Sequence, residues 1–387
     1  MEHLQQDFNV NYRYKVYFTE HLFNTSNNLF NEFLEEGHQP GILQKIFFIL
    51  DSRVVEQQPD LIRQIDSYFD ANKQIKLISE KIIIGGGEDA KNDGHFFDQI
   101  TEAVSVHGID RHSYIAAIGG GAILDLVGYA AAVSHRGIKH IRIPTTVLSQ
   151  NDSGVGVKNG INYLGKKNFL GTFAPPVAVF NDYNFLISLS DRHWRSGISE
   201  AVKVSLIKDS WFFEWIEKNA EALAARNKEA MQYLVWHCAK LHMQHIGGGD
   251  PFEKGSSRPL DFGHWSAHKL EQLTNFEVLH GEAVAIGIAL DTVYSTLSGR
   301  LPEESSERVV QLLLKLGLPV THPLILPENE NSPILVGMEE FREHLGGRLT
   351  IMLLDSIGKG VEVHEMDPEL IKKAAKRLQN RTEPIHR

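Results

Sequence analysis

A glutamate and three histidines have the spacing of a metal site or an acid/base site. His264 and His268 stand four residues apart in a stretch with a helical pattern, so both imidazoles project from one helix face. His280 follows after a short break, ahead of a small-residue helix predicted at 283–290, and could reach the same point. A histidine pair at this spacing is more often an ordinary surface or core feature.

A third ligand upstream, Glu200, favours the metal. It lies in the segment Ser199-Glu-Ala-Val-Lys203, which places a carboxylate and an ammonium group three residues apart on another predicted helix. A glutamate with two histidines would give a divalent metal three ligands and leave one position open for a substrate. The single cysteine, Cys238, excludes a thiolate cluster as the metal site and excludes an internal disulfide.

The composition is that of a soluble globular enzyme. The 387 residues are 42% hydrophobic and 23% charged, and the formal net charge is -10. This acidic surplus argues against nucleic acid as a partner, because no basic face is available to bind phosphates. No apolar run approaches eighteen residues and the first eleven residues are mostly polar, unlike a signal peptide, so we expect a cytoplasmic protein without a membrane segment.

The first half of the chain has the alternation of an open α/β sheet. Strand patterns lie at 14–18, 45–50, 81–84, 114–118, 138–144 and 177–181, with helical patterns at 27–36, 61–69 and 123–133. From about residue 182 helices dominate, at 195–207, 209–225, 228–246, 263–275, 282–298 and 304–316, before a hairpin (349–354 with 361–364) and a last helix at 367–378. We predict an α/β Rossmann-like domain at 1–185 and an all-helical domain at 186–387, with the metal in a cleft between them.

A glycine-rich turn marks a candidate cofactor site. Gly119-Gly-Gly121 follows the strand at 114–118 and begins a helix. Such a turn lets backbone amides approach a pyrophosphate at the helix N-terminus. A full G-x-G-x-x-G fingerprint would need glycine at the position of Leu124, so the motif alone is weak evidence for a dinucleotide.

A long segment, 149–176, carries lysines and amides among glycines and is predicted to be a loop. Loops of that length in compact domains are usually functional, although their lysines are often merely solvated. Lys158 and Lys167 in this segment, Arg136 one element earlier and Lys203 beside Glu200 could converge. Several cations around one cleft favour a phosphorylated substrate.

Several motifs follow one another in a fixed order. They are Gly119-Gly-Gly-x-x-x-Asp125, His135-Arg-Gly, Ile143-Pro-Thr-Thr146, Asp152-Ser-Gly-Val-Gly-Val-Lys158, Lys167-Asn168, Glu200-Ala-Val-Lys203, Gly263-His264 and Leu279-His-Gly-Glu282. Their order, over about residues 45–300, resembles that of the 3-dehydroquinate synthase superfamily, the sugar phosphate cyclases. Such a cyclase oxidises a hydroxyl with NAD, eliminates phosphate, returns the hydride and closes a ring by aldol addition, so NAD is recycled.

The resemblance implies NAD in the Rossmann-like domain, a catalytic metal and a homodimer. The metal, usually zinc with cobalt as an alternative, would be held by Glu200, His264 and His280. Catalytic or substrate contacts, phosphate included, are implied for Arg136, Asp152, Lys158, Lys167, Asn168, Lys203 and His268. Cofactor contacts are implied for Asp51, Glu88, Lys91, Gly119, Gly120, Gly121, Asp125, Thr145 and Thr146.

Some positions depart from the dehydroquinate synthase pattern. Asp261 stands where that pattern has an asparagine, and Arg258 is one residue nearer to it than the expected arginine. No lysine fits the family's carboxylate-binding position within 240–243, and segment 340–347 replaces a lysine-bearing one. Asp261 and that segment are more similar to 2-epi-5-epi-valiolone synthases, which cyclise sedoheptulose 7-phosphate. Because a carboxylate at 261 would repel a substrate carboxylate, we expect a ketose phosphate without one, bound with help from Asp261 and Arg258.

Three alternatives stay open. One is an authentic 3-dehydroquinate synthase acting on 3-deoxy-arabino-heptulosonate 7-phosphate. The second is a metal-dependent polyol dehydrogenase of the glycerol dehydrogenase type, which Lys158, Lys167 and Lys203 disfavour because a plain polyol has no phosphate. The third is a catalytically silent NAD-binding scaffold, expected if the altered region 240–258 holds no substrate.

Overall fold

The computed structural model describes residues 3–248, 251–252, 259–329, 331–344 and 347–382. The chain divides into two compact units, each made of two chain segments. Unit 1 comprises Met1–Pro144 and Val157–Asp182, and unit 2 comprises Thr145–Gly156 and Tyr183–Arg387. Within the described residues no helix is long and apolar enough to cross a membrane.

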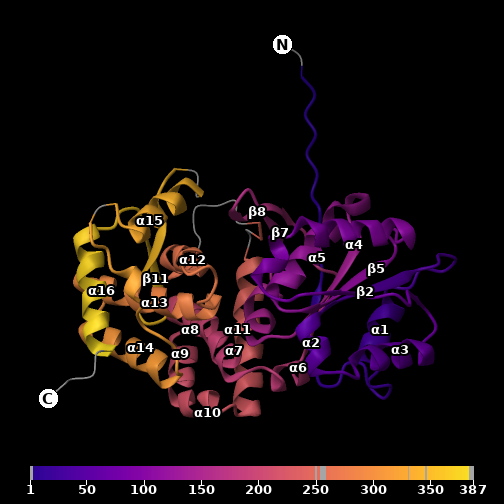
Figure 1. The fold of residues 1–387 in the computed structure, drawn as a ribbon, viewed down its shortest axis with the longest axis horizontal. Helices are drawn as coiled ribbons and strands as arrows, with labels where there is room; N and C mark the ends of the chain where they lie inside the picture. The colour runs from indigo at the N-terminus through magenta and orange to yellow at the C-terminus, as the bar shows by residue number, and fades with distance from the viewer. Residues whose placement is uncertain (1–2, 249–250, 253–258, 330, 345–346, 383–387) are drawn as a thin grey trace. The chain divides into compact units, whose positions relative to one another are not determined.

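Unit 1 is built on a seven-stranded sheet whose strands pair in parallel (Figure 1). The strands are β1 (Lys15–Thr19), β2 (Lys45–Asp51), β3 (Lys76–Leu77), β4 (Ile82–Ile84), β5 (Tyr114–Gly119), β6 (Lys139–Pro144) and β9 (Ala178–Asp182). Their order is β1-β9-β6-β5-β2-β3, and β4 also pairs with β2. Strands β2, β5 and β9 are buried almost throughout, as a parallel sheet covered on both faces requires.

Helices cover both faces of this sheet. They are α1 (Leu29–Glu36), α2 (Ser52–Gln57), α3 (Leu61–Ala71), α4 (Gly94–Val106) and α5 (Gly121–Val133), with short 3-10 turns η1 (Glu88–Lys91) and η2 (Ser134–Arg136). Phe47 and Ile49 of β2 pack into an aliphatic core with α4 and α5. Phe48, between them, packs edge-to-face on Phe69 of α3 on the opposite face. The predicted Rossmann-like α/β class is confirmed, although helix α4 was missed.

The prediction that 149–176 forms a loop without regular structure is wrong. The segment contains a π-helical turn, η3 (Ser149–Ser153), and an antiparallel hairpin of β7 (Lys158–Tyr163) and β8 (Lys166–Phe173). The two residues between these strands, Leu164 and Gly165, both have positive φ, 52° and 73°. Positive φ at both positions is typical of a two-residue hairpin turn. The sequence Asn-Gly would have predicted such a turn, but Leu-Gly does not.

Unit 2 is helical, as predicted. Its helices are α6 (Asn184–Ile187), α7 (Asp191–Ser196), α8 (Ile198–Lys208), α9 (Ser210–Lys218), α10 (Ala220–Ala224), α11 (Lys228–Gly247), η4 (Pro259–Asp261), α12 (His264–Leu273), α13 (His280–Leu297), α14 (Glu303–Lys315), η5 (Pro323–Ile325), α15 (Pro333–His344) and α16 (Pro368–Thr382). The expected hairpin is β10 (Ile351–Ser356) with β11 (Lys359–Val363). Helix α13 is buried along most of its length and forms the centre of the unit.

Candidate metal site and cofactor site

In unit 2, Glu200, His264 and His280 present three potential ligand atoms within 4.8 Å of one another. Glu200 Oε1 lies 3.6 Å from His264 Nε2 and 3.4 Å from His280 Nε2. The Glu200 side chain is fully buried, and Oε1 accepts no hydrogen bond from the residues that the structure describes. A buried carboxylate oxygen without a donor, facing two imidazole nitrogens, fits a divalent metal with nitrogen and oxygen ligands.

Helix starts position both histidines. His264 is the first residue of α12 and His280 the first residue of α13, while Glu200 lies in the first turn of α8. Before α12, Gly263 has φ +77°, where a side chain would be strained, so the chain can turn sharply into His264. Asp291 stabilises this turn by accepting hydrogen bonds from Gly263 N (3.1 Å) and Trp265 Nε1 (2.9 Å).

The start of α13 is fixed by an ion pair. Glu282 accepts a hydrogen bond from Leu279 N at 2.9 Å, which satisfies a free donor at the helix N-terminus. Arg192 of α7 holds the same carboxylate through two nitrogens, at 2.6 and 2.7 Å. These contacts set the direction in which His280 leaves the helix.

The tautomers of both histidines suit metal binding. His264 Nδ1 is 3.1 Å from the Phe262 carbonyl oxygen, and His280 Nδ1 is 3.1 Å from Glu271 Oε2. When each Nδ1–H donates to its oxygen, each Nε2 keeps its lone pair toward Glu200. Burial, followed by Lys203 and His280, holds the pKa of His264 well below its usual value, so its imidazole is neutral.

Glu271 was missed by the sequence analysis, although it stands two helical turns after His264. We expect Glu271→Ala to weaken zinc binding by about 10- to 100-fold, because a metal-bound histidine loses orientation without its outer hydrogen-bond partner. Competition with a zinc chelator measures this affinity. The exposed Glu277 is the matched control, and Glu277→Ala should leave the affinity unchanged. Equal affinities of the two variants would contradict the assignment.

Asp291 makes the unfolding free energy depend on pH. Burial raises the pKa of Asp291 to about 7 from 3.8, against the two hydrogen bonds, which lower it. Between these values the folded state holds a proton that the unfolded state releases, so the unfolding free energy falls as pH rises, by at most about 4 kcal/mol. Urea unfolding of metal-free protein at about pH 5 and about pH 8 should show about 2.6 kcal/mol of this loss, and Asp291→Asn should flatten it. An unchanged difference in the variant would refute the assignment.

His268 lies beside the metal site but outside the Glu200 group. Its ring centroid is 5.4 Å from that of His264 and 6.0 Å from that of His280. With Glu271 and His280 it forms a second set of potential ligands within 4.8 Å. Glu271 Oε2 already contacts His280 Nδ1, so this second set has the geometry of an outer shell around the first.

Acidic groups surround the buried Lys203. Its ammonium group makes an ion pair with Glu200, and its side chain is 3% exposed. Burial lowers the pKa of Lys203, but the charges of Glu200, Asp152 and Asp261 outweigh it and raise the pKa, so the lysine stays protonated. Burial and Glu200 raise the pKa of Asp152, yet Lys203 and His242 bring it below its usual value. Glu200, Asp152, Asp261 and Lys203 therefore form one charge network.

Helix α11 contributes His242 to this network. His242 Nδ1 lies 2.8 Å from Asp152 Oδ1 in the turn η3. Two residues earlier on α11, the exposed Lys240 places its ammonium group 5.3 Å from the ring centroid of Trp236. Within residues 240–243, where no lysine fits the family's carboxylate-binding position, His242 is thus the residue that contacts Asp152. The sequence did not predict this contact.

Arg258 and segment 340–347 also depart from the dehydroquinate synthase pattern. Arg258 lies outside the described residues. In the replaced segment 340–347, Glu340 of α15 makes an ion pair with Lys269 of α12, with nitrogen–oxygen distances of 2.9 and 2.8 Å. This segment therefore contacts the helix that carries His264 and His268.

In unit 1, the candidate cofactor residues gather at the carboxyl ends of β2 and β5. The chain runs from β2 outward to β3 and returns to β5 on the other side of β2, so the gap between β2 and β5 is a topological switch point. Asp51 ends β2 and accepts a hydrogen bond from Arg53 N at 2.9 Å. At the end of β5, a Cβ on Gly119 would lie 2.8 Å from Ile123 Cβ, so only glycine allows α5 to start so close. Gly120 and Gly121 begin that helix.

A buried lysine ties the rest of this site together. Lys91 Nζ lies 3.0 Å from Asp125 Oδ2 and 3.6 Å from Glu88 Oε1, and it also contacts Asn168 Oδ1. Asn162 bonds both Glu88 Oε1 (3.1 Å) and the backbone nitrogen of Asn168 (2.8 Å). Glu88 and Lys91 of η1, Asp125 of α5 and Asn168 of β8 were all predicted as site residues and lie together here. Asn162, which joins them, was not predicted. Asn168, assigned to the substrate, lies among the cofactor residues.

The remaining candidates are not part of these clusters in the interactions described. Arg136 and Lys158 are exposed and Lys167 is partly exposed, all in unit 1. Arg136 follows His135, and both have positive φ (60° and 50°), an uncommon conformation for residues other than glycine. Thr145 and Thr146 belong to unit 2, where Thr146 Oγ1 lies 2.8 Å from Ser149 Oγ.

Comparison with known proteins identifies the family. The models of the 3-dehydroquinate synthase N-terminal and C-terminal domains match residues 81–196 and 197–336. The 3-dehydroquinate synthase of Nitrosospira multiformis is 37% identical over 296 residues, covering 76% of this chain and 79% of that protein. That of Pseudoalteromonas atlantica is 33% identical over 348 residues, covering 86% and 94%.

Solved structures agree with this in fold. The 2-epi-5-epi-valiolone synthase of Streptomyces hygroscopicus subsp. jinggangensis, with NAD+ and Zn2+ bound, is 27% identical, covers 98% of this chain and 100% of that chain, and superposes with a TM-score of 0.87. A 2-deoxy-scyllo-inosose synthase, 24% identical, shares the fold with a TM-score of 0.77 over 94% of this chain and 96% of that chain. The chain therefore belongs to the 3-dehydroquinate synthase family, the sugar phosphate cyclases.

Proposed function

We propose that this enzyme, a carbon–oxygen lyase of its family, is a NAD- and metal-dependent cyclase of a ketose phosphate without a carboxylate, such as sedoheptulose 7-phosphate. The observation that carries the proposal is Asp261, the one of the three acids acting on the buried Lys203 that departs from the dehydroquinate synthase pattern. A substrate carboxylate placed there would meet like charges, which costs several kcal/mol in a partly desolvated site. Hydroxyl groups would instead donate hydrogen bonds to these acids.

Among the described residues, three basic side chains of this region already have partners. Lys203 pairs with Glu200, His242 pairs with Asp152, and Lys240 packs on Trp236. These contacts support a polyhydroxylated substrate over a keto acid. Arg136, Lys158 and Lys167 remain our proposed contacts for its phosphate.

Glu200, His264 and His280 would hold the metal, zinc or cobalt. When bound, it supplies a Lewis acid that lowers the pKa of a coordinated hydroxyl. His268, beside both histidine ligands, is placed to hold or move a proton of the substrate. Lys203 keeps a positive charge that stabilises an oxyanion. Support for the metal also comes from the Zn2+ in the valiolone synthase.

NAD would bind in unit 1 along Gly119–Gly121, with Asp51 at the ribose. When bound, it supplies a reversible hydride acceptor. NAD at about 100 times its dissociation constant should stabilise the protein by about 2.7 kcal/mol, because it binds only the folded state. Thermal unfolding with and without NAD measures this. Asp51→Asn should shrink the shift, whereas replacement of the exposed Asp98 of α4 by asparagine should not. No shift at saturating NAD would reject the cofactor.

The main alternative is 3-dehydroquinate synthase activity, favoured by the curated relatives of 33% and 37% identity. We would supply sedoheptulose 7-phosphate and 3-deoxy-arabino-heptulosonate 7-phosphate separately, with NAD and zinc or cobalt. Inorganic phosphate release and NADH absorbance are followed together. We expect phosphate without net NADH, faster from the ketose phosphate. A faster keto acid phosphate would reject the proposed substrate.

Asp261→Asn sharpens the same test. Replacing the acid by an amide removes one negative charge near Lys203, so kcat/KM for the keto acid phosphate should rise relative to that for the ketose phosphate. An unchanged ratio would show that Asp261 does not choose the substrate. Stoichiometric NADH without phosphate release from either sugar would instead indicate a polyol dehydrogenase.

A further inference from the structure

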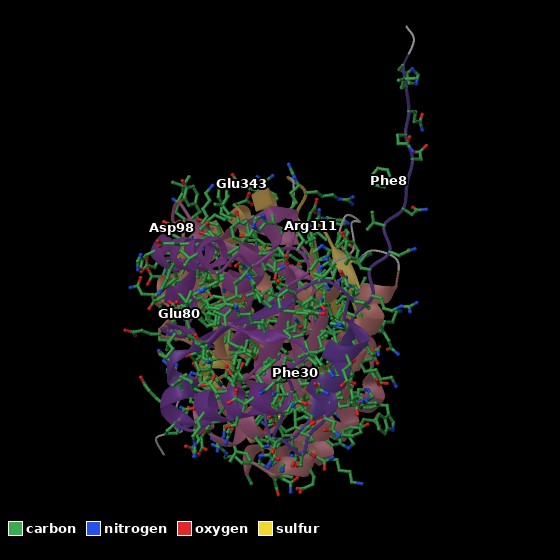
Figure 2. All side chains as sticks on the ribbon, turned by 90° about the vertical axis from the view of Figure 1, so that its right-hand side faces the viewer. Phe8, Phe30, Glu80, Asp98, Arg111 and Glu343 are labelled. Atoms are coloured by element: carbon green, nitrogen blue, oxygen red, sulfur yellow. The ribbon has the colours of Figure 1, made fainter. Side chains whose placement is uncertain are left out.

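The first described residues form an extended arm with a strand pattern. In the N-terminal arm, residues 3–14, even positions are mostly apolar and odd positions are polar. Alternation of this kind places all apolar side chains on one face of a β-strand. Yet the arm is outside the sheet, and Leu4, Phe8, Val10 and Tyr12 are 103, 78, 60 and 59% exposed. Figure 2 shows Phe8 on a stretched segment leading away from the folded body.

The arm runs directly into β1, at the border of the sheet. β1 pairs with β9 on one side and is the terminal strand of the sheet order. An outer strand can accept a further strand along its other edge. A partner that pairs with the arm could therefore extend its pairing onto the start of β1.

The arm is complementary to itself in one antiparallel register. With Val10 opposite the Val10 of a second copy, Asp7 faces Arg13, Phe8 faces Tyr12 and Asn9 faces Asn11, each twice by symmetry. The same register places Leu4 opposite Val16 of β1. A shift by one residue would place each apolar side chain opposite a polar one. Opposite-charge and aromatic pairs are those that stabilise antiparallel strands.

We propose that the N-terminal arm is a dimerisation strand that pairs with the same arm of a second copy, centred on Val10. The contact is two-fold symmetric, so it closes with two chains. It would cover the exposed apolar face, which a single chain leaves in water. A two-stranded ribbon alone is marginal, so continuation onto the edge of β1 is part of the contact. The proposal does not depend on the reaction that the enzyme catalyses.

Charge exchange tests the register. Light scattering during size-exclusion chromatography of the full-length protein should show a dimer. Asp7→Arg alone and Arg13→Asp alone each create two like-charge pairs, and we expect each to raise the dimer dissociation constant about ten-fold or more. The double variant Asp7→Arg/Arg13→Asp restores opposite charges and should restore the dimer. Single variants as dimeric as the unsubstituted protein, or a double variant that stays weak, would overturn the register.

A cross-link tests the centre of symmetry. Directly opposed residues have Cβ atoms close enough for a disulfide after small adjustment, so Val10→Cys should give a covalent dimer under mild oxidation. The native Cys238 is buried and should not react. Asn11→Cys is the matched control, because its opposite residue is Asn9. A monomeric unsubstituted protein, or equal cross-linking of both cysteine variants, would reject the proposal.

Discussion

Replacing His264 by alanine is expected to abolish stoichiometric zinc binding and to lower kcat/KM by about 100-fold or more. The loss should exceed the 10- to 100-fold effect of an outer hydrogen-bond partner, since one of three direct ligands is gone. In His264, Nε2 is the nitrogen that faces the site, 3.6 Å from Glu200 Oε1, while Nδ1 faces a backbone carbonyl. Alanine removes this nitrogen and offers no ligand atom in its place. Metal content by atomic absorption after dialysis is the direct measurement.

His268→Ala is the matched control for this experiment. The residue lies one turn along α12 and close to both histidine ligands, but it does not belong to the Glu200 group. We expect that variant to keep one zinc per chain while losing activity. Full zinc in the His264 variant, or loss of zinc only in the His268 variant, would require a different ligand set. The His268, Glu271 and His280 group would then be the candidate.

Replacing Lys203 by methionine should have the second large effect. Glu200 is fully buried and Lys203 is its ion-pair partner, so the variant leaves a buried carboxylate uncompensated. Removing one partner of a buried pair typically costs about 3–5 kcal/mol of unfolding free energy. Urea unfolding of the metal-free protein should show this loss. Activity of the zinc-loaded variant should fall by about 100-fold or more, because Lys203 no longer stabilises an oxyanion.

Lys208→Met is the matched control, because it removes a lysine from the same helix without leaving a buried carboxylate unpaired. Lys208 ends the same helix, α8, but is exposed. Its replacement should change stability by less than about 0.5 kcal/mol, as expected for a surface site. Zinc should restore part of the stability that Lys203→Met loses, because the metal also compensates Glu200. A zinc effect no larger than in the unsubstituted protein would contradict that charge balance.

The proposed metal ligands, which the structure brings together, could be named from the sequence because their chemistry and spacing are visible there. The supporting residues could not. Glu271 matters through one contact with His280, nine residues along the chain and across a turn. His242 matters because α11 packs on η3, a contact between segments about ninety residues apart. Such partners depend on tertiary packing, which local pattern does not encode.

Strand and helix prediction failed where local signals were weak. The β7–β8 hairpin lies among glycines, and its turn residues are Leu164 and Gly165, so neither alternation nor turn chemistry marked it. Helix α4 is an exception, because Phe96, Ile100, Ala103 and Val104 have the spacing of a helix face and the helix could have been predicted from them. By contrast, β2 and β5 are continuous apolar runs bounded by turns, and both were predicted within one residue of their ends.

The position of β9 governs the order in which this protein can fold during synthesis. β9 pairs with β1 through all five of its residues, Ala178–Asp182, and also pairs with β6, so it separates two strands made much earlier. Until residue 182 has left the ribosome, β1 and the edge of β6 lack their neighbour and remain open to wrong pairing. Closing this long connection is slow because its entropic cost comes before any contact forms. A gene fragment ending at residue 144 would therefore encode an incomplete sheet.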